Sequence, residues 1–444
     1  MVHRKGMVRA AACAALACAG IVRAGEGVAA QDQGPFFRPL MLDDVATAPA
    51  ADQAAAPAPA ATPKPLMSVL DKAGIAKPLN DAGINIYGFV EGGYTYSASA
   101  PPGNVITGRV FDTKHERIVL DQLDLTIERV IDYAAAAKAG KFDIGGRFEA
   151  LYGWDAGLIH SSGLYDNPAT LGVSKGYYSS RTQPENQFDI NQAYLDVAVP
   201  LGTGLRVRAG KFVTPLGAEV INPTGNALYS HSYLFGFAIP FTQTGIIGEY
   251  KLNDDWLIDA GITRGWNQSI RDNNGSPDFL GTVTWTPQES DALKKWTVAV
   301  SLSEGPQGTH DNHDWWTVID IVATYAASDK VTLKLNADYG DAPHSGQWYG
   351  IAGYASYVLN PVVTLNARAE WYSDQNGFTL GLVGANNVYE ATVGVAITPF
   401  PNNDIGKNLV IRPEVRMDYS DKRFYDGATD HYQFTAALDA YFVF

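Results

Sequence analysis

The chain has 444 residues, of which 46% are apolar, 11% aromatic and only 18% charged, and its formal net charge is −14. Soluble domains carry about 25% charged residues, so this composition is unusual for them. The acidic balance argues against a nucleic-acid partner. No stretch of about 18 apolar residues follows the N-terminal region, which excludes a membrane-spanning helix there.

The first 30 residues have the features of a secretory signal peptide. Basic residues precede an apolar stretch at 10–22, and the sequence Val-Ala-Ala at 28–30 predicts cleavage after residue 30, with cleavage after Ala24 as the alternative. Cys13 and Cys18, the two cysteines, lie in this segment, so we expect a mature chain without disulfides or thiol chemistry. Lipidation of Cys18 is disfavoured because no Leu stands three residues before it.

Residues 31–80 form a predicted periplasmic linker. Positions 31–65 are rich in Ala and Pro, and such a segment buries too little apolar surface to offset its ordering entropy. We expect it to be disordered. Residues 66–80 can add one short helix.

From Ile84 onward the sequence alternates with period two. Residues 331–340 (VTLKLNADYG) place Val, Leu, Ala and Tyr on one face and Thr, Lys, Asn and Asp on the other, and 362–372 and 409–419 repeat the pattern. Pro413 lies within the segment 409–419 and removes one hydrogen bond between neighbouring strands, because proline has no N–H. The pattern predicts strands at 84–96, 117–131, 140–154, 188–199, 205–213, 241–252, 256–265, 279–287, 295–303, 315–326, 330–340, 347–358, 362–372, 388–399, 409–419 and 431–443.

The lengths of these strands and of their connections distinguish a membrane barrel from a soluble sandwich. Most predicted strands run nine to thirteen residues, whereas strands have about ten residues in membrane barrels and about five or six in soluble sheets. Connections after every second strand are mostly short, whereas the others are mostly long, with 304–314 among the long ones and 341–346 as an exception. Outer-membrane barrels have tight periplasmic turns and long external loops. The sequence therefore predicts an all-β fold for residues 81–444, a transmembrane antiparallel β-barrel of about 16 strands in the outer membrane of a Gram-negative bacterium.

The last strand ends the chain with alternating aromatic residues. Residues 431–444 read HYQFTAALDAYFVF. A terminal Phe after such a strand resembles the signal that the barrel-assembly machinery recognises, so this machinery is an expected partner, together with the lipid bilayer and lipopolysaccharide.

Several segments resemble one family of barrels. The block at 210–245 (GKFVTPLGAEVINPTGNALYSHSYLFGFAIPFTQTG) is similar to the BBP2, or OmpL-like, family of outer-membrane β-barrel porins. So are 121–129 (DQLDLTIER), 191–196 (NQAYLD) and 87–94 (YGFVEGGY). The resemblance covers roughly 84–444. It implies a transmembrane barrel with a transport role and supplies no substrate.

The connection 214–240 is the strongest candidate for a functional segment. A barrel of about 16 strands keeps an aqueous lumen, and a lipid-facing Lys or Arg costs roughly 2–4 kcal/mol, so charged strand residues must face inward. This connection is unusually rich in Leu, Ile, Tyr and Phe for a loop, so we expect it to pack inside the barrel as a constriction. A cap over the mouth or a subunit contact is the alternative. Glu219, His231 and the tyrosines would face the opening, across from a basic wall at Arg206, Arg208 and Lys211. The predicted pore-lining and constriction residues are Arg147, Glu149, Arg206, Arg208, Lys211, Glu219, His231, Tyr233, Arg368, Arg412 and Arg416.

The sequence thus predicts a porin-like channel for passive diffusion of small hydrophilic solutes. A non-conducting receptor or adhesin acting through 155–187 is an alternative, and a barrel hydrolase is another, although no GxSxG element supports it. No catalytic residue and no cofactor are expected. The stretch 310–314 (HDNHD) has metal-capable side chains but no evident further ligand, so we expect no metal site. A homotrimer is one expected oligomeric state; the solute and ion selectivity stay open.

Overall fold

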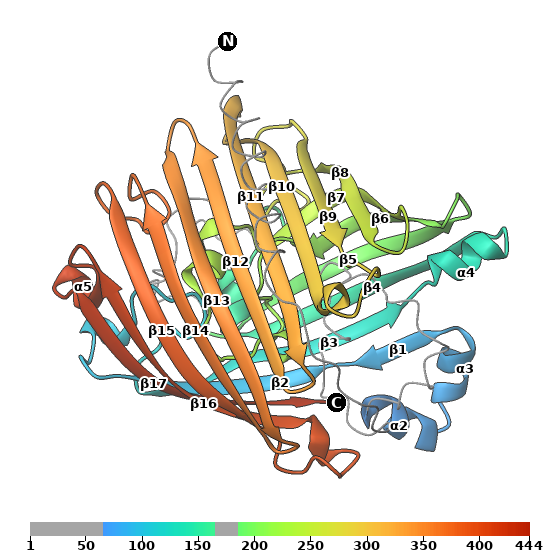
Figure 1. Cartoon of the computed structure of the whole chain (residues 1–444), viewed down its shortest axis with the longest axis horizontal. Helices are drawn as coiled ribbons and strands as arrows, with labels where there is room; N and C mark the ends of the chain where they lie inside the picture. Colours follow the sequence, from blue (N-terminus) through green and yellow to red (C-terminus); the bar gives the residue numbers. More distant parts are fainter. Residues whose placement is uncertain (1–64, 165–184) are drawn as a thin grey trace. The chain divides into compact units, whose positions relative to one another are not determined.

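The computed structural model describes residues 65–164 and 185–444, in which one antiparallel sheet closes into a barrel of 16 strands (Figure 1). β1 and β2 are two parts of one strand that both pair with β3. β9 pairs with β10 and β17 pairs with β2, which closes the sheet. This confirms the predicted fold class. The strands are β1 Ile84–Tyr87, β2 Phe89–Ser97, β3 Arg117–Arg129, β4 Asp143–Gly153, β5 Gln187–Val199, β6 Leu205–Val213, β7 Thr242–Lys251, β8 Trp256–Thr263, β9 Asp278–Trp285, β10 Trp296–Gly308, β11 Asp311–Ser328, β12 Val331–Ala342, β13 Gly346–Asn360, β14 Val363–Asp374, β15 Asn386–Ile397, β16 Leu409–Ser420 and β17 Tyr432–Val443.

Short helices occupy the connections and the segment before β1. The 66–80 region holds two helices where one was expected, and the second ends one residue beyond the predicted linker. Met67 is buried there, and its Sδ accepts a hydrogen bond from the Ile86 backbone N–H at 3.4 Å, so this segment packs beside β1. The predicted signal peptide and residues 31–64 of the segment expected to be disordered lie outside the described residues, whereas Pro65, the last residue of that segment, begins a helix. The helices are α2 Pro65–Lys72, α3 Ala76–Asp81, α4 Tyr133–Lys138 and α5 Tyr425–Ala428, with single helical turns η2 Pro102–Asn104, η3 Asp155–Leu158, η4 Pro223–Gly225, η5 Leu234–Ala238, η6 Leu293–Lys295 and η7 Gly406–Asn408.

Among the described helices, none is long and apolar enough to cross a bilayer.

The strands bury their polar faces and expose their apolar ones. In β12, Asn336 and Asp338 are 1% and 4% exposed, whereas Leu333, Leu335 and Tyr339 are 41–42% exposed. A soluble sheet would show the opposite distribution. The apolar faces therefore form the lipid-facing surface, and the charged residues lie inside the barrel.

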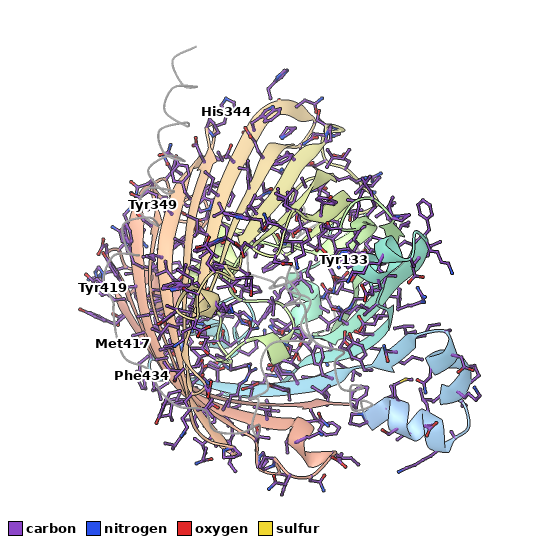
Figure 2. The ribbon with its side chains drawn as sticks, turned by 45° about the vertical axis from the view of Figure 1, so that its right-hand side comes forward. Tyr133, His344, Tyr349, Met417, Tyr419 and Phe434 are labelled. Atoms are coloured by element: carbon purple, nitrogen blue, oxygen red, sulfur yellow. The ribbon has the colours of Figure 1, made fainter. Side chains whose placement is uncertain are left out.

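Two bands of outward-facing aromatic residues mark the membrane interfaces. One band follows a row of cross-strand neighbours through Trp371, Tyr389, Tyr419 and Tyr432 on β14–β17. Tyr419 points away from the barrel, as do Tyr349, Met417 and Phe434 (Figure 2). At the other end Trp256 pairs with Trp285 across β8 and β9, and Trp296 pairs with Tyr325 across β10 and β11. Such bands lie at the headgroups on both sides of a bilayer.

The three longest connections of the barrel all lie at the same end. We call the end where β1 begins and β17 finishes the terminal end, and the opposite end the loop end. The connections 98–116, 154–186 and 214–241 are at the loop end, and the turns at 200–204 and 329–330 are at the terminal end. The predicted long connection at 304–314 is wrong, because β10 and β11 continue to a turn at 309–310. Beyond the membrane neither face of these strands is apolar, so the alternation that signals a strand disappears there.

Gly88 allows the chain to close next to its own C-terminus. Its N–H donates to the Phe444 carbonyl at 3.1 Å, and the Phe444 N–H donates back at 2.8 Å. A Cβ at this position would lie 2.1 Å from the Asp124 carbonyl oxygen. Only glycine fits here, which explains the interruption between β1 and β2.

Candidate pore constriction

The connection 214–240 begins against the inward faces of β11 and β12. The Gly217 N–H donates to Asp320 Oδ1 at 3.1 Å, and the Ala218 N–H donates to Asn336 Oδ1 at 3.0 Å. Lys334 Nζ donates to the Ala218 carbonyl at 3.0 Å. These side chains all come from wall strands, so the connection enters the barrel directly after β6.

Two wall carboxylates hold the middle of the connection. Glu370 of β14 accepts hydrogen bonds from the N–H groups of Tyr233 and Leu234, both at 2.7 Å. Glu414 of β16 accepts from the N–H groups of Tyr229 at 2.8 Å and of the following Ser230 at 3.1 Å. Each carboxyl group accepts with both of its oxygens. Each carboxylate therefore fixes two consecutive peptide units against the wall.

Arginines on the same strands bind the carbonyl groups of the connection. Arg368 Nη1 donates to the Ser230 carbonyl and Arg416 Nη1 to the His231 carbonyl, both at 2.6 Å. Arg412 Nη1 donates to the Asn226 carbonyl at 2.7 Å. The wall thus supplies acceptors for N–H groups and donors for carbonyls that would otherwise be buried without partners.

The connection also contacts the wall on the other side of the closure, at β3. Gln122 Nε2 donates to the Ile221 carbonyl at 2.8 Å, and the Tyr229 hydroxyl lies 3.3 Å from both carboxylate oxygens of Asp121. Its contacts therefore extend from β3 to the strands β11–β16.

Two clusters of apolar side chains pack around the connection 214–240 inside the barrel. In the first, Leu216, Leu234 and Ile239 of the connection pack with inward-facing wall residues such as Trp348 and Tyr372. In the second, Ile221 and Phe235 pack with Phe111 of the connection 98–116 and with Phe89 and Leu151. The apolar composition that predicted an internal position for 214–240 is accounted for by these contacts.

The predicted orientation of Glu219, His231 and Tyr233 is wrong. Glu219 Oε1 lies 2.7 Å from Arg368 Nη1 of β14, and the arginines of β6 are not its partners. His231 is buried between Asn226, Phe111 and Phe235, and the Tyr233 hydroxyl donates to Asp418 at 2.8 Å. All three side chains attach the connection to other protein groups.

Burial and charge control the protonation of two of these groups. Burial lowers the pKa of His231 to about 4, so the imidazole is neutral at pH 7. Burial raises the pKa of Glu219, but Arg368, His231 and the Ser232 N–H together outweigh it and hold that pKa below its ordinary value. The Glu219–Arg368 contact is therefore an ion pair inside the barrel.

The predicted basic wall consists of separate ion pairs. Arg206 binds Glu249, Arg208 binds Asp196 through two bonds of 2.9 Å, and Lys211 Nζ lies 3.3 Å from Asp189. Arg147 Nε lies 3.0 Å from Glu149 in the same manner. Because each cation has its own carboxylate, the described wall shows no extended basic surface.

Sequence reasoning missed the part played by the connection 98–116. Arg109 is buried, with its Nη2 2.9 Å from Asp418 Oδ2 and its Nη1 3.6 Å from Asp112. Phe111 packs edge-on against His231 at 4.9 Å between ring centroids. The signal was the pair of apolar dipeptides at 105–106 and 110–111, which is unusual for an exposed loop.

In the described ranges, no three His, Cys, Asp or Glu side chains are grouped so that they could hold a metal ion. The stretch 310–314 lies at the tip of the β10–β11 hairpin, where His344 Nδ1 is 3.3 Å from Asp314.

Comparison with known proteins identifies a family and several similar structures. A family model described as "Putative beta-barrel porin-2, OmpL-like" matches residues 83–444. No curated protein sequence matches the chain. Among solved structures, the outer membrane channel DcaP of Acinetobacter baumannii has 14% identity and a TM-score of 0.53, covering 81% of this chain and 97% of its own. OprB of Pseudomonas putida has 13% identity and a TM-score of 0.51, covering 84% and 97%. An anion-selective porin from Comamonas acidovorans has 10% identity and a TM-score of 0.51, covering 81% and 99%.

A closed barrel with an apolar outer belt and a charged interior defines a porin-type protein of the Gram-negative outer membrane. The chain belongs to the OmpL-like family of β-barrel porins.

Proposed function

We propose that this protein is a diffusion channel for small hydrophilic solutes, in which the connection 214–240 narrows the passage. The observation that carries the proposal is the attachment of this connection to inward-facing side chains on both sides of the barrel closure. Glu370 and Glu414 fix its N–H groups at one side, and Gln122 of β3 fixes the Ile221 carbonyl at the other. A segment held in this way reduces the cross-section open to a solute.

The proposed solutes are polar and of either charge. Inward-facing arginines are ion-paired with carboxylates, singly as in Arg206–Glu249 and Arg208–Asp196 or with two of them as in Arg368. Paired charges produce short-range polarity and little net potential along the passage. The neighbour from Comamonas acidovorans is described as anion-selective. We propose a weaker ion preference for this chain.

A second candidate function is a non-conducting receptor. The apolar clusters around Tyr233 and Phe235 favour it, because apolar packing inside the barrel opposes the entry of water. The two candidates make opposite predictions about permeability. The proposal assigns no catalytic residue.

A liposome-swelling assay distinguishes the candidates. The full chain is reconstituted into liposomes, which are diluted into isotonic solutions of neutral sugars of increasing size. The channel proposal predicts swelling that slows steeply as the sugar grows, whereas protein-free liposomes do not swell. Folded protein that gives no swelling with the smallest sugar would contradict the channel and favour the receptor. The oligomeric state, with a homotrimer as one expectation, is measured by mass on the same preparation.

A further inference from the structure

The connection 214–240 crosses the interior in front of strands β7–β10, because it leaves the wall after β6 and already contacts β11 at Gly217. Its two ends are apolar there. Five residues of its ends and of the wall belong to one packed cluster, and we call them the apolar seam: Leu216 and Ile239 of the connection, Ile247 of β7, Leu280 of β9 and Val318 of β11. Each of them is at most 9% exposed, so the seam is closed in this conformation.

The wall residues of the apolar seam lie in one row of cross-strand neighbours. Ile247, Leu280 and Val318 follow one another in this row, separated only by Gly261 and Ser303. Large apolar side chains therefore alternate with small residues from β7 to β11, and the row presents a continuous apolar surface to the connection.

The apolar seam is narrow along the strands. On β9 the inward positions on the two sides of Leu280 are Asp278 and Thr282, and both are buried. On β7 the inward position that follows Ile247 toward the terminal end is Glu249. The seam is thus a short apolar step in a polar wall. Water leaves a narrow apolar constriction readily, and ions do not cross it without water.

The apolar seam also differs from the other attachments of the connection in its lack of directional bonds. Within 65–164 and 185–444, residues 214–240 form no hydrogen bond with β7–β10, whereas Glu370 of β14 and Arg412 of β16 bind their N–H and carbonyl groups. Separation from β14 and β16 would leave those buried groups without partners. Separation at the seam would not, so the connection moves away from β7–β10 most easily.

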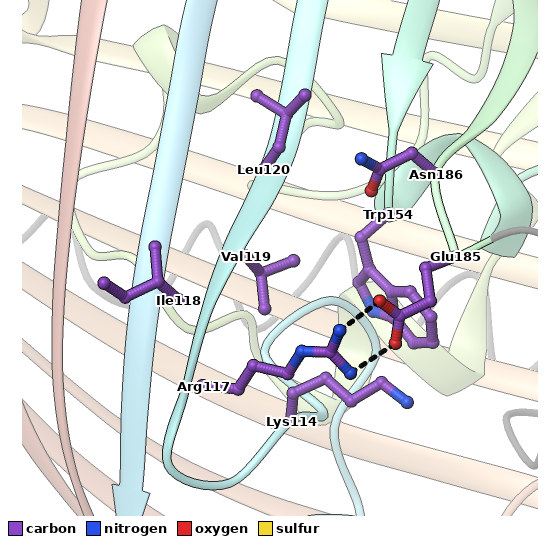
Figure 3. A pocket seen from close by; sticks show the side chains of 8 residues that line it. All are labelled: Lys114, Arg117, Ile118, Val119, Leu120, Trp154, Glu185 and Asn186. Atoms are coloured by element: carbon purple, nitrogen blue, oxygen red, sulfur yellow. Dashed lines mark hydrogen bonds and ion pairs between the residues drawn. The ribbon is translucent and has the colours of Figure 1, made fainter.

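Charged contacts hold the loop end near β3, in contrast to the apolar seam. Arg117 of β3 is ion-paired with Glu185, which precedes β5, in a pocket that Lys114 and Trp154 also line (Figure 3). Lys114 Nζ lies 4.2 Å from the centroid of the Trp154 ring. This ion pair joins β3 to the end of the connection 154–186, so the loop end is fastened by charges on that side.

We propose that solutes pass between the connection 214–240 and strands β7–β10, and that the apolar seam is the barrier that selects uncharged solutes over ions. This inference rests on the proposed channel function. A solute that contacts the seam replaces its apolar contacts while it passes. An ion must keep its water, which the apolar side chains do not bind, so it crosses more slowly than an uncharged solute of similar size.

Conductance of the full chain in a planar bilayer with potassium chloride tests the barrier. Leu280→Asn keeps the branched shape of the side chain and makes it polar, so it should conduct at least about threefold more than the wild type. Leu280→Ala creates space without polarity and should raise the conductance less. A larger effect of Leu280→Ala than of Leu280→Asn would show a steric obstruction and would overturn the apolar barrier.

The same exchange of a methyl for a hydroxyl group at two positions of β11 provides the matched control. Val318→Thr changes the apolar seam and should raise the conductance. Val322→Thr changes an inward-facing residue nearer the terminal end, which belongs to neither described cluster, and should conduct like the wild type. An equal rise in both variants would place the barrier elsewhere.

The rate of liposome swelling with a neutral sugar separates ion selection from a general widening. In Leu280→Asn and Val318→Thr this rate should change less than the conductance, and an equal rise in both quantities would contradict selection by the seam. Folding is checked by heat-modifiable gel migration, and Val318→Thr serves if Leu280→Asn does not fold. Equal, measurable conductance in all folded proteins would overturn the seam and leave the channel. No conductance in any of them would contradict the channel and the seam with it.

Discussion

Arg368 of β14 and Glu219 of the connection 214–240 form an ion pair of 2.7 Å inside the barrel. The guanidinium also binds Glu390 of β15 at 2.7 Å and the Ser230 carbonyl at 2.6 Å. One wall residue thus joins a neighbouring strand to two points of the inserted connection. The stability of the barrel therefore depends on the contacts between the connection and the wall.

Replacing Arg368 should destabilise the barrel. Arg368→Ala leaves the buried carboxylate of Glu219 without its ion-pair partner, which costs about 3–5 kcal/mol, and leaves Glu390 with only Arg416, at 3.6 Å, among the described cations. The free energy of unfolding in urea, measured in lipid vesicles, checks this. Arg206→Ala is the control: Arg206 is more exposed and, among the described residues, forms an ion pair with Glu249 alone, so its loss should cost clearly less. Equal losses in the two variants would contradict the special position of Arg368.

Acidification should destabilise the region around His231. The pKa of the folded state is about 4 and that of the unfolded state is near 6.5, so the unfolded chain binds the proton first. The contribution is complete above pH 6.5 and is lost between pH 6.5 and 4, on the order of 3 kcal/mol. The lowered pKa of Glu219 adds a further loss at lower pH, below its unfolded value.

The unfolding free energy of wild type and His231→Gln, measured from pH 7 to pH 4, tests this dependence. The variant should lose most of the slope between pH 6.5 and 4. His310→Gln, at the hairpin tip, should keep it. An unchanged slope in the His231 variant would assign the effect to other groups.

Gly88→Ala should prevent normal closure of the barrel. The added Cβ would meet the Asp124 carbonyl oxygen at 2.1 Å and the Phe444 ring at 2.9 Å, and the Asp124 backbone is held in β3 by its pairing with Leu151 of β4. We expect little folded protein by heat-modifiable gel migration. Gly353→Ala is the matched control, since its Cβ would have no atom within 4 Å. Normal folding of Gly88→Ala would show that the closure adapts.

The periodic pattern of the sequence predicted the strands well because the alternation within a strand is a local property of its residues. β6 has its predicted bounds of 205–213, and the same alternation in the other strands predicted the 16-strand barrel. Strand ends beyond the bilayer, as in β10 and β11, were underestimated because their two faces are equally polar. Contact with lipid produces the alternation of apolar and polar residues, and these strand ends have no such contact.

The partners of the candidate constriction residues were not predictable in the same way. Glu219 and Arg368 are 149 positions apart, and their meeting depends on the stagger of the strands and on the path of the connection inside the barrel. Alternation shows that a side chain faces inward, but it does not give the position of that side chain along the barrel axis. The sequence therefore indicated that 214–240 lies inside, and it assigned Glu219 to the wrong wall.

Single-channel conductance in a planar bilayer tests the central claim most directly. Glu370→Ala/Glu414→Ala removes the acceptors of four N–H groups in the connection 214–240, each of which costs about 1–3 kcal/mol when left buried without a partner. The control Glu128→Ala also removes an inward-facing carboxyl group, next to Arg147 and away from the connection. If the connection narrows the passage, the double variant should conduct roughly twofold more or fluctuate between levels, and the control should conduct like the wild type. A double variant that folds and has the conductance and noise of the wild type would contradict the constriction.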